Sequence, residues 1–354
     1  MHNSPPETEI VGSLHIHSRY SDGAGSVREV ANAAKRAGLD FIAFNDHAYM
    51  TDALHAEEEG FYDGVLVLMA LEIGRRYHHY LAYDLKKMVS GFELGPQAVI
   101  DRVSDLGGFG FLAHPFEKGM PFSEKSVAYT WNDLTVKGFA GICIWNFSSR
   151  WKERVKTALH ALYFLTFKSQ TLKGPSSETL AFWDKLCRDR QVVAIGGSDA
   201  HGTRFKWGPF NFVPLSYEHT LGAVTVHLLL EKDLPQEVDG AKQLIYDALR
   251  KGRLFIAHEH LAPARGFRFH YACEQGIQLT MGEEAPFQPG VFSIRLPRKG
   301  LVRLIRDGVV VKQWREREVA FKPPGPGVYR VEVFCRLPLF GWRPWIYSNP
   351  IYLR

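Results

Sequence analysis

A series of apolar runs, each ending on a histidine or an acidic residue, constrains this chain more than any other feature of its sequence. The first run, SLHIH, leads into the loop SRYSDG and carries His15, His17 and Asp22. Because side chains on a strand alternate between two faces, we expect His15 and His17 to point the same way and to share one ion. An isolated pair of this kind is weak evidence, since strand histidines often bond only to backbone carbonyls.

The same pattern recurs in four further segments, and this repetition strengthens the prediction of a metal site. LDFIAFN runs into His47, GVLVLMAL ends at Glu72, and GFGFLAHP ends on His114. QVVAIGG leads into SDAHG, which carries Asp199 and His201. Helical periodicity separates several of these runs, so we expect parallel strands joined by crossover helices, an α/β fold. In a barrel of this kind, functional side chains gather at the C-terminal ends of the strands.

We therefore expect one bowl lined by nitrogen and oxygen ligands. His79 is preferred over its neighbour His78, because the order HHYLAY places His79 next to the following extended run. The set is too large for one ion, and two or three divalent ions bridged by Glu72 would use it fully. Ligands of this kind suit Zn, Mn or Fe. The predicted metal ligands are His15, His17, Asp22, His47, Glu72, His79, His114, Asp199 and His201.

The texture of the chain changes near Pro263. Before it, buried strands alternate with helices. After it, short alternating runs such as VFSIRL, VVVKQW and VYRVEVF are separated by Gly and Pro turns, a pattern typical of a small β-sandwich. We predict a domain over residues 1–262 that holds the metal site, and an accessory all-β domain over residues 263–354.

Composition excludes several classes of protein. The 354-residue chain has a net charge of +5 without a basic run, so no nucleic-acid footprint is evident and an anionic ligand is only weakly favoured. The start, MHNSPPETEI, lacks an export signal, and no apolar run is long enough to cross a bilayer. Its four cysteines are widely spaced, which argues against disulfides and thiolate zinc sites. We expect a cytoplasmic protein; the sequence leaves its oligomeric state open.

Four cations follow strand ends and are candidates for binding a substrate phosphate. They are Lys118, Arg150, Arg204 and Lys206. Exposed cations in loops are usually only solvated, so this reading competes with a purely surface role. Glu72, Asp199 and His201 are the candidate catalytic residues.

The ordered motifs resemble those of the PHP superfamily, metal-dependent phosphoesterases named for polymerase-associated domains and histidinol phosphatase. The family's H-x-H and S-D-G motif is matched by His15, His17 and Asp22, and its H-P pair by His114 and Pro115. Its G-S-D-A-H motif is matched at 197–201, and the likeness spans residues 10 to about 260. The resemblance implies a distorted barrel of about seven βα units. The tail resembles the β-domain of a bacterial branch that also includes carbamate-ester hydrolases.

The resemblance further implies how the ligands divide among three ions. His15, His17, Glu72 and Asp199 would hold the first, Asp22, His47 and His201 the second, and Glu72, His79 and His114 the third. A hydroxide formed between ions would then cleave a small phosphorylated metabolite or nucleotide, an anionic phosphate ester. Two alternatives stay open: hydrolysis of a neutral carbamate, ester or amide at the same centre, and a metal-stabilised binding scaffold without catalysis.

Overall fold

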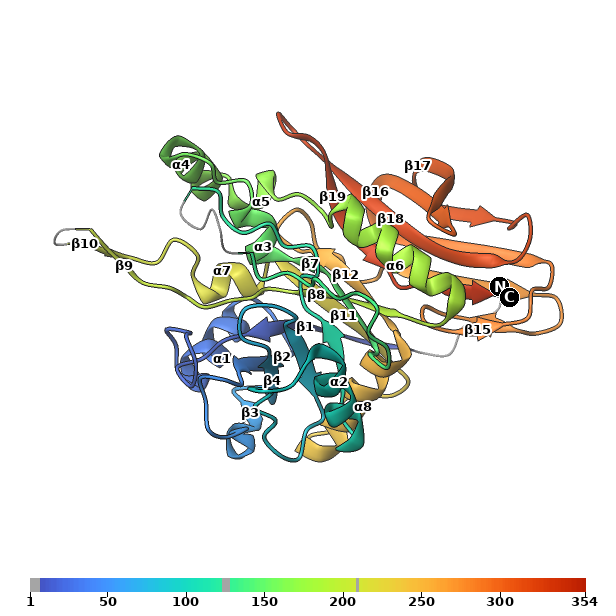
Figure 1. The fold of residues 1–354 in the computed structure, drawn as a ribbon. Helices are drawn as coiled ribbons and strands as arrows, with labels where there is room; N and C mark the ends of the chain where they lie inside the picture. The colour runs from blue at the N-terminus through green and yellow to red at the C-terminus, as the bar shows by residue number, and fades with distance from the viewer. Residues whose placement is uncertain (1–6, 123–127, 208–209) are drawn as a thin grey trace. The chain divides into compact units, whose positions relative to one another are not determined.

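The computed structural model describes residues 7–122, 128–207 and 210–354, and its elements are labelled in Figure 1. The chain forms two compact units. The first unit comprises Val11–Ser176 and Ile195–Val226, and the second comprises residues up to Ile10, Ser177–Ala194 and His227–Arg354. The predicted boundary between residues 262 and 263 falls inside the second unit and stays a prediction. Residues 1–6, which belong to the segment expected to lack an export signal, lie outside the described residues.

The first unit mixes short strands and helices. Its elements are α1 (Val27–Arg36), β2 (Phe41–His47), η1 (Ala56–Glu58), β3 (Gly60–Tyr62), β4 (Val65–Ile73), β5 (Tyr80–Tyr83), α2 (Pro96–Asp105), β6 (Phe109–Leu112), β7 (Gly141–Asn146), α3 (Phe147–Lys152), α4 (Ala158–Thr166), α5 (Lys168–Thr171), β9 (Phe205–Trp207), β10 (Phe210–Phe212) and α7 (Tyr217–Leu221). Three strands run across the unit boundaries: β1 (Thr8–Ile16), β8 (Val193–Gly197) and β11 (Val224–Leu230).

The strands that precede the predicted ligands pair mostly in parallel. β1 pairs with β2 and β2 with β4 in parallel register, and β6 pairs with β7 in the same sense. β5 differs, because it lies antiparallel to both β4 and β6. A short loop, residues 74–79, replaces the crossover helix between β4 and β5, so this part of the chain is not a regular βα repeat.

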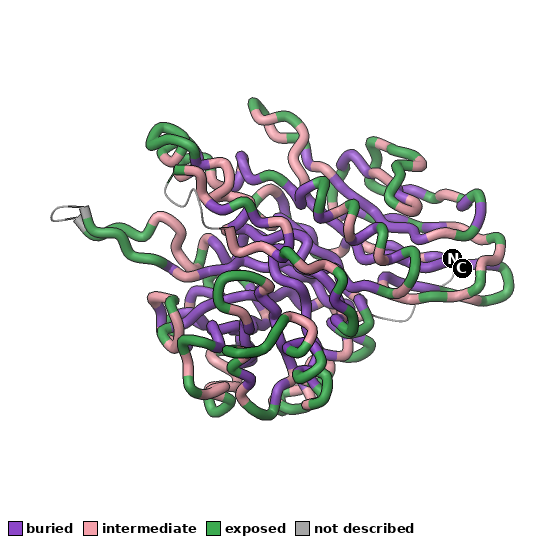
Figure 2. Tube along the Cα trace, in the orientation of Figure 1, coloured by how far each residue is buried: buried purple, intermediate pink, exposed green. Residues whose placement is uncertain are grey.

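Local sequence explains where the first helix begins and what it buries. The Ser26 hydroxyl accepts from the Glu29 backbone N–H, and the Glu29 carboxylate accepts from the Ser26 N–H at 2.8 Å, which completes a capping box. The buried face of α1 carries Val27, Val30 and Ala34 into a core shared with β2 and β4. Figure 2 shows these inner segments buried.

The second unit is dominated by long antiparallel strands. Its elements are α6 (Ser177–Asp189), α8 (Val238–Lys251), β12 (Leu254–His258), β13 (Arg268–Cys273), β14 (Gln278–Leu279), β15 (Glu284–Ala285), β16 (Gly290–Arg306), β17 (Val309–Phe321), β18 (Gly327–Leu337), β19 (Gly341–Ser348) and β20 (Ile351–Leu353). β16 pairs antiparallel with β13, β17 and β18, and β18 with β19 and β20. The mixed α/β character and the C-terminal antiparallel region are thus confirmed, whereas barrel closure and the sandwich arrangement stay predictions.

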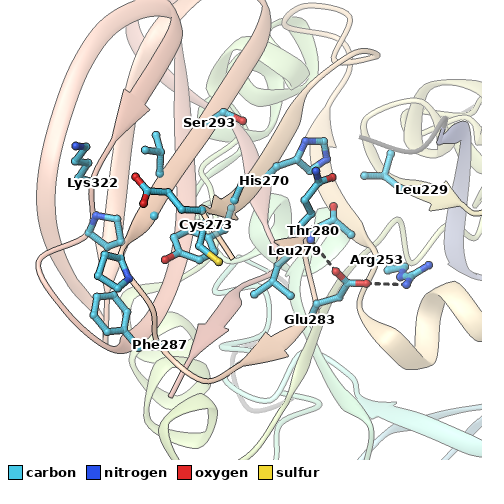
Figure 3. A pocket seen from close by; sticks show the side chains of 18 of the residues that line it. Leu229, Arg253, His270, Cys273, Leu279, Thr280, Glu283, Phe287, Ser293 and Lys322 are labelled. Carbon is cyan, nitrogen blue, oxygen red and sulfur yellow. Dashed lines mark hydrogen bonds and ion pairs between the residues drawn. The ribbon is translucent and has the colours of Figure 1, made fainter. Parts of the chain in front are cut away.

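A cavity of about 1060 Å³ lies within the second unit (Figure 3). The Glu283 carboxylate lies at its edge, where it accepts from Arg253 Nη2 at 2.7 Å and from the Thr280 N–H at 2.8 Å. Apolar side chains such as Leu279 and Phe287 also line it, together with polar ones such as His270 and Lys322. None of the sequence-predicted site residues lines this cavity.

The structure also bears on membrane crossing and on the state of the cysteines. Among the described residues, no helix has both the length and the apolar character that a bilayer crossing requires. The four cysteines, Cys143, Cys187, Cys273 and Cys335, are buried free thiols.

A buried ion pair joins α6 to the C-terminal strands within the second unit. Arg330 Nε and Nη2 donate to the two Asp184 oxygens at 2.7 and 2.8 Å, and Nη1 donates to Glu332 Oε1 at 2.6 Å. Replacing Arg330 with Met would leave two buried carboxylates without their cation. We predict a loss of about 3 to 5 kcal/mol in the free energy of unfolding, measured by urea denaturation.

Lys299→Met is the control for this prediction. Lys299 and Glu316 lie 3.6 Å apart, but both side chains are largely exposed, so their pair contributes little. Equal stability losses in the two variants would show that the Arg330 pair is not a structural tie.

Candidate metal centre

The nine predicted ligands come together at strand ends in the first unit. β1 supplies His15 and leads to His17, and β2 ends on His47. Glu72 is the second-last residue of β4, and Asp199 follows β8. Most of them are buried, whereas the side chains of Asp22 and His201 are 38% and 26% exposed, so the site opens to solvent at their side. The cavity there has a volume of about 580 Å³.

Glu72 lies at the middle of this cluster and is 1% exposed. Five imidazole nitrogens surround its carboxylate. From Oε1, the distances are 2.8 Å to His79 Nδ1, 3.2 Å to His15 Nε2 and 3.3 Å to His114 Nε2; from Oε2, they are 3.2 Å to His47 Nδ1 and 3.4 Å to His17 Nε2. A carboxylate has about four lone-pair sites and cannot accept hydrogen bonds from five rings. Three of the five nitrogens, on His15, His17 and His47, form no hydrogen bond among the described residues.

The spacing of these atoms fits shared metal coordination. Two ligands bound about 2.0 to 2.2 Å from one ion lie roughly 3.0 to 3.5 Å apart. His15 Nε2 and His17 Nε2 lie 3.5 and 3.4 Å from Asp199 Oδ1, within this range. Four ring nitrogens are buried and have no hydrogen-bond partner among the described residues. They are His15 Nε2, His17 Nδ1, His17 Nε2 and His47 Nδ1. Buried lone pairs without donors favour cations between the rings.

The ligand atoms fall into overlapping groups, each within 4.8 Å. The groups are His17, Asp22, His47 and His201; His15, His17 and Asp199; His15, Glu72 and His114; His47, Glu72 and His79; and His114, Glu117 and Asp199. One group, His15 with His17 and Asp199, lies wholly within one of the three predicted ligand sets, whereas the other four groups mix the sets or include Glu117. The division among ions stays a prediction, as do the ligand roles.

Several ligands sit on strained backbone. His15, His114 and Asp199 have positive φ values of 64°, 29° and 52°. The pairing of β1 with β2 shifts register between Ser13 and Ile16, so His15 lies within a β-bulge. Left-handed backbone costs about 1 to 2 kcal/mol at a residue with a side chain, and such strain concentrates at functional sites.

Neighbouring polar groups hold the ligand-bearing loops in place. The Asp46 carboxylate accepts from the Ser18 N–H and hydroxyl, both at 2.7 Å, and from the Ser21 hydroxyl at 2.5 Å. Asn45 Oδ1 accepts from the His15 N–H at 3.1 Å. Asp46 therefore positions the loop that presents Asp22.

Electrostatics favour deprotonated carboxylates and at least one neutral imidazole. Burial, together with His201 and His47, lowers the pKa of His17 to about 3. Burial tends to raise the pKa of Glu72, but the surrounding histidines, His15 foremost, outweigh it and hold the pKa well below its ordinary value. Neutral imidazole and ionised carboxylate are the forms that bind metal.

The pKa values of His114 and His201 are raised, in contrast to that of His17. Burial tends to lower the pKa of His114, but Glu117 and Glu72 raise it to about 9. Burial has the same effect at His201, where Asp22 and Asp199 prevail and raise the pKa to about 9.

The sequence analysis missed two residues of this site. Glu117 is 6% exposed and lies 3.5 Å from His114 Nδ1 and 3.2 Å from Lys152 Nζ. The Ser149 hydroxyl also donates to Glu117. Glu117 could have been recognised from its position three residues after His114. No local sequence pattern identifies Lys152, the last residue of α3.

The four cations predicted to bind phosphate lie elsewhere. None lines the cavity of the metal cluster. Arg150 Nε donates to the Gly174 carbonyl at 2.8 Å and its Nη1 pairs with Glu153. Arg204 lines a separate shallow pocket, and Lys118 and Lys206 are exposed. Their role in substrate binding stays a prediction.

A known protein-family model matches part of this chain. Residues 13–130 match the family model described as the PHP domain. This confirms the resemblance on which the expected metal site depended. Residues 13–130 are therefore similar to a PHP domain, and the described residues include largely buried groups of His, Asp and Glu that are able to bind metal.

Three curated relatives share limited stretches with it. The α subunit of DNA polymerase III from Treponema pallidum is 32% identical over 96 residues, which are 22% of this chain and 8% of that protein. The DNA polymerase/3'-5' exonuclease PolX of Bacillus subtilis is 48% identical over 40 residues, 11% and 7% of the two chains. An uncharacterised protein of Methanocaldococcus jannaschii is 25% identical over 118 residues, 29% and 66%. The matches thus span less than a tenth of the two polymerases.

Two solved structures are similar at 14% identity. A two-domain protein from Bacteroides vulgatus, named for a predicted PHP-like metal-dependent phosphoesterase, gives a TM-score of 0.47 and covers 97% of this chain and 95% of its own. A candidate metal-dependent phosphoesterase from Bifidobacterium adolescentis gives 0.32, covering 59% and 93%. Both TM-scores lie below 0.5.

Replacing Glu72 with Gln should remove metal without unfolding the chain. The substitution keeps the size of the side chain but removes the charge that faces five imidazoles. We predict two or three ions per wild-type chain and at least one fewer in Glu72→Gln, measured by elemental analysis after loading with Mn or Zn.

Glu93→Gln, at an exposed glutamate of the same unit, should keep the wild-type metal content. A single ion or none in the loaded wild type, or full metal content in Glu72→Gln, would contradict the bridging role.

Metal affinity should increase as the pH rises from 7 to 9. The raised pKa values of His114 and His201, both about 9, mean that the metal-free protein holds protons there at neutral pH. An ion must displace these protons, so affinity should rise roughly tenfold per pH unit for each proton displaced. Competition with a chromogenic chelator, corrected for its own protonation, measures this. Affinity that does not change across this range would contradict it.

Proposed function

We propose that this protein is a metal-dependent hydrolase that cleaves phosphate esters. The observation that carries the proposal is the Glu72 carboxylate, buried at the base of an open cavity and approached by five imidazole nitrogens within 3.4 Å. A scaffold without catalysis would not require ligands that face a cavity with exposed members such as Asp22.

The described residues fit two or three divalent ions. Glu72 would bridge them, with Asp199 and the surrounding histidines completing the coordination. Such ions, when bound, lower the pKa of water to about 7 and stabilise negative charge on an ester's oxygens. No serine or cysteine nucleophile is then needed, and the one cysteine close to the site, Cys143, is buried with its pKa raised by that burial.

Lys152 is the cation best placed to meet a substrate phosphate. It is the one lysine or arginine among the described residues that line the cavity. Its ammonium lies 3.2 Å from Glu117 and over the ring of Tyr129. An ammonium held there would contact a phosphoryl oxygen beside the ligand cluster.

A neutral carbamate, ester or amide is the second candidate substrate. The observation in its favour is that Glu117 already neutralises Lys152, so the protein itself adds little positive charge to the cavity. The positive charge of bound ions is the property that would favour phosphate instead.

Lys152→Met separates the two candidates. If Lys152 contacts phosphate, kcat/KM for p-nitrophenyl phosphate should fall roughly a hundredfold, whereas hydrolysis of p-nitrophenyl acetate and metal content should change little. Lys86→Met, at an exposed lysine of the same unit outside the cavity, should change neither rate. Hydrolysis of the neutral ester alone by the wild type would favour the second candidate, and hydrolysis of neither by metal-loaded protein would refute the proposal.

A further inference from the structure

The cavity beside the ligand cluster is lined by polar and by apolar side chains. The polar ones are those of the cluster, and the apolar ones, which we call the apolar wall, come from three separate segments of the first unit. The apolar wall includes Phe122, Trp151, Ala161, Leu165, Phe205 and Phe212. A metal site needs no such wall, so its presence requires an explanation in terms of the substrate.

Helix α4 supplies the first part of the wall. Ala161 and Leu165 are four residues apart and therefore lie on the same face of the helix, which faces the cavity. Trp151 Nε1 donates to the Phe164 carbonyl at 3.3 Å and ties α4 to α3. Leu162, on another face, is 64% exposed and does not line the cavity.

The β9–β10 hairpin supplies the second part. Phe205 and Phe212 are directly opposite each other in its register, and their rings stack 5.8 Å apart. Both line the cavity, yet they are 49% and 44% exposed. Figure 2 shows the described residues of this hairpin and of α4 largely exposed. Covering such partly exposed aromatic rings with an apolar group removes apolar surface from water and is therefore favourable.

The charge of the cavity argues against highly charged substrates. Lys152 is the one lysine or arginine in the described lining and already pairs with Glu117, so no further basic side chain is available there for a second phosphate. The apolar wall offers no partner for the further phosphates or the ribose of a nucleotide.

We propose that the substrate carries a large apolar group, alkyl or aromatic, next to the ester that is hydrolysed. The ester lies against the ligand cluster and the apolar group lies against α4 and the β9–β10 hairpin. This inference depends on the proposed function for the position of the ester, but the binding of the apolar group can be tested separately.

The test uses a matched pair of substrates with the same leaving-group chemistry. With metal-loaded protein, kcat/KM for hexyl phosphate should exceed that for ethyl phosphate by roughly tenfold to a hundredfold, because each buried methylene adds binding free energy. Hexylphosphonate, which is not hydrolysed, should bind more tightly than ethylphosphonate by a similar factor in calorimetry.

Leu165→Asn and Phe212→Ser should reduce both ratios severalfold, and Leu162→Asn, on the same helix but outside the cavity, should leave them unchanged. Ratios near one, or ratios unaffected by the Leu165 and Phe212 variants, would overturn the inference. If neither phosphate is hydrolysed but hexylphosphonate still binds more tightly, the proposed function fails and the apolar site stands. Absence of any phosphonate binding would overturn the inference.

Discussion

The geometry of the candidate centre depends on a negative charge buried among five imidazole rings. Glu72 cannot form ordinary hydrogen bonds with five imidazoles, and a buried carboxylate without compensation is costly. Divalent ions between the carboxylate and the rings would satisfy both partners at the observed separations. The strand pairing of the first unit is compatible with such a centre, because β1, β2 and β4 pair in parallel and so end at the same edge.

Backbone strain is the cost of bringing the ligands to that edge. His15, His114 and Asp199 adopt left-handed backbone conformations that are more common for glycine. The bulge in β1 places His15 beside Asp199. Hydrogen bonds from Asp46 and Asn45 stabilise the same strands and loops. Metal binding would offset part of this strain, since the ions bind the folded arrangement only.

The strands and the ligand candidates could be predicted because each apolar run is followed by a histidine or an acidic residue. This pattern is local and can be recognised without knowledge of the tertiary structure. The antiparallel β5 was not, since a short apolar run does not reveal its direction. The cations were also not predictable: Arg150 follows a strand yet pairs with Glu153, whereas Lys152, two residues later, lines the cavity. Which side of a short helix faces a site is decided by tertiary packing, here by the tie between Trp151 and α4.

The central claim is that Glu72 joins ions into one centre. Crystals of metal-loaded protein, measured at the absorption edge of the bound metal, test it directly through anomalous difference density. The account predicts at least two peaks around Glu72, with carboxylate oxygens bound to more than one ion at about 2.0 to 2.2 Å. A single peak, or ions bound without Glu72, would contradict it.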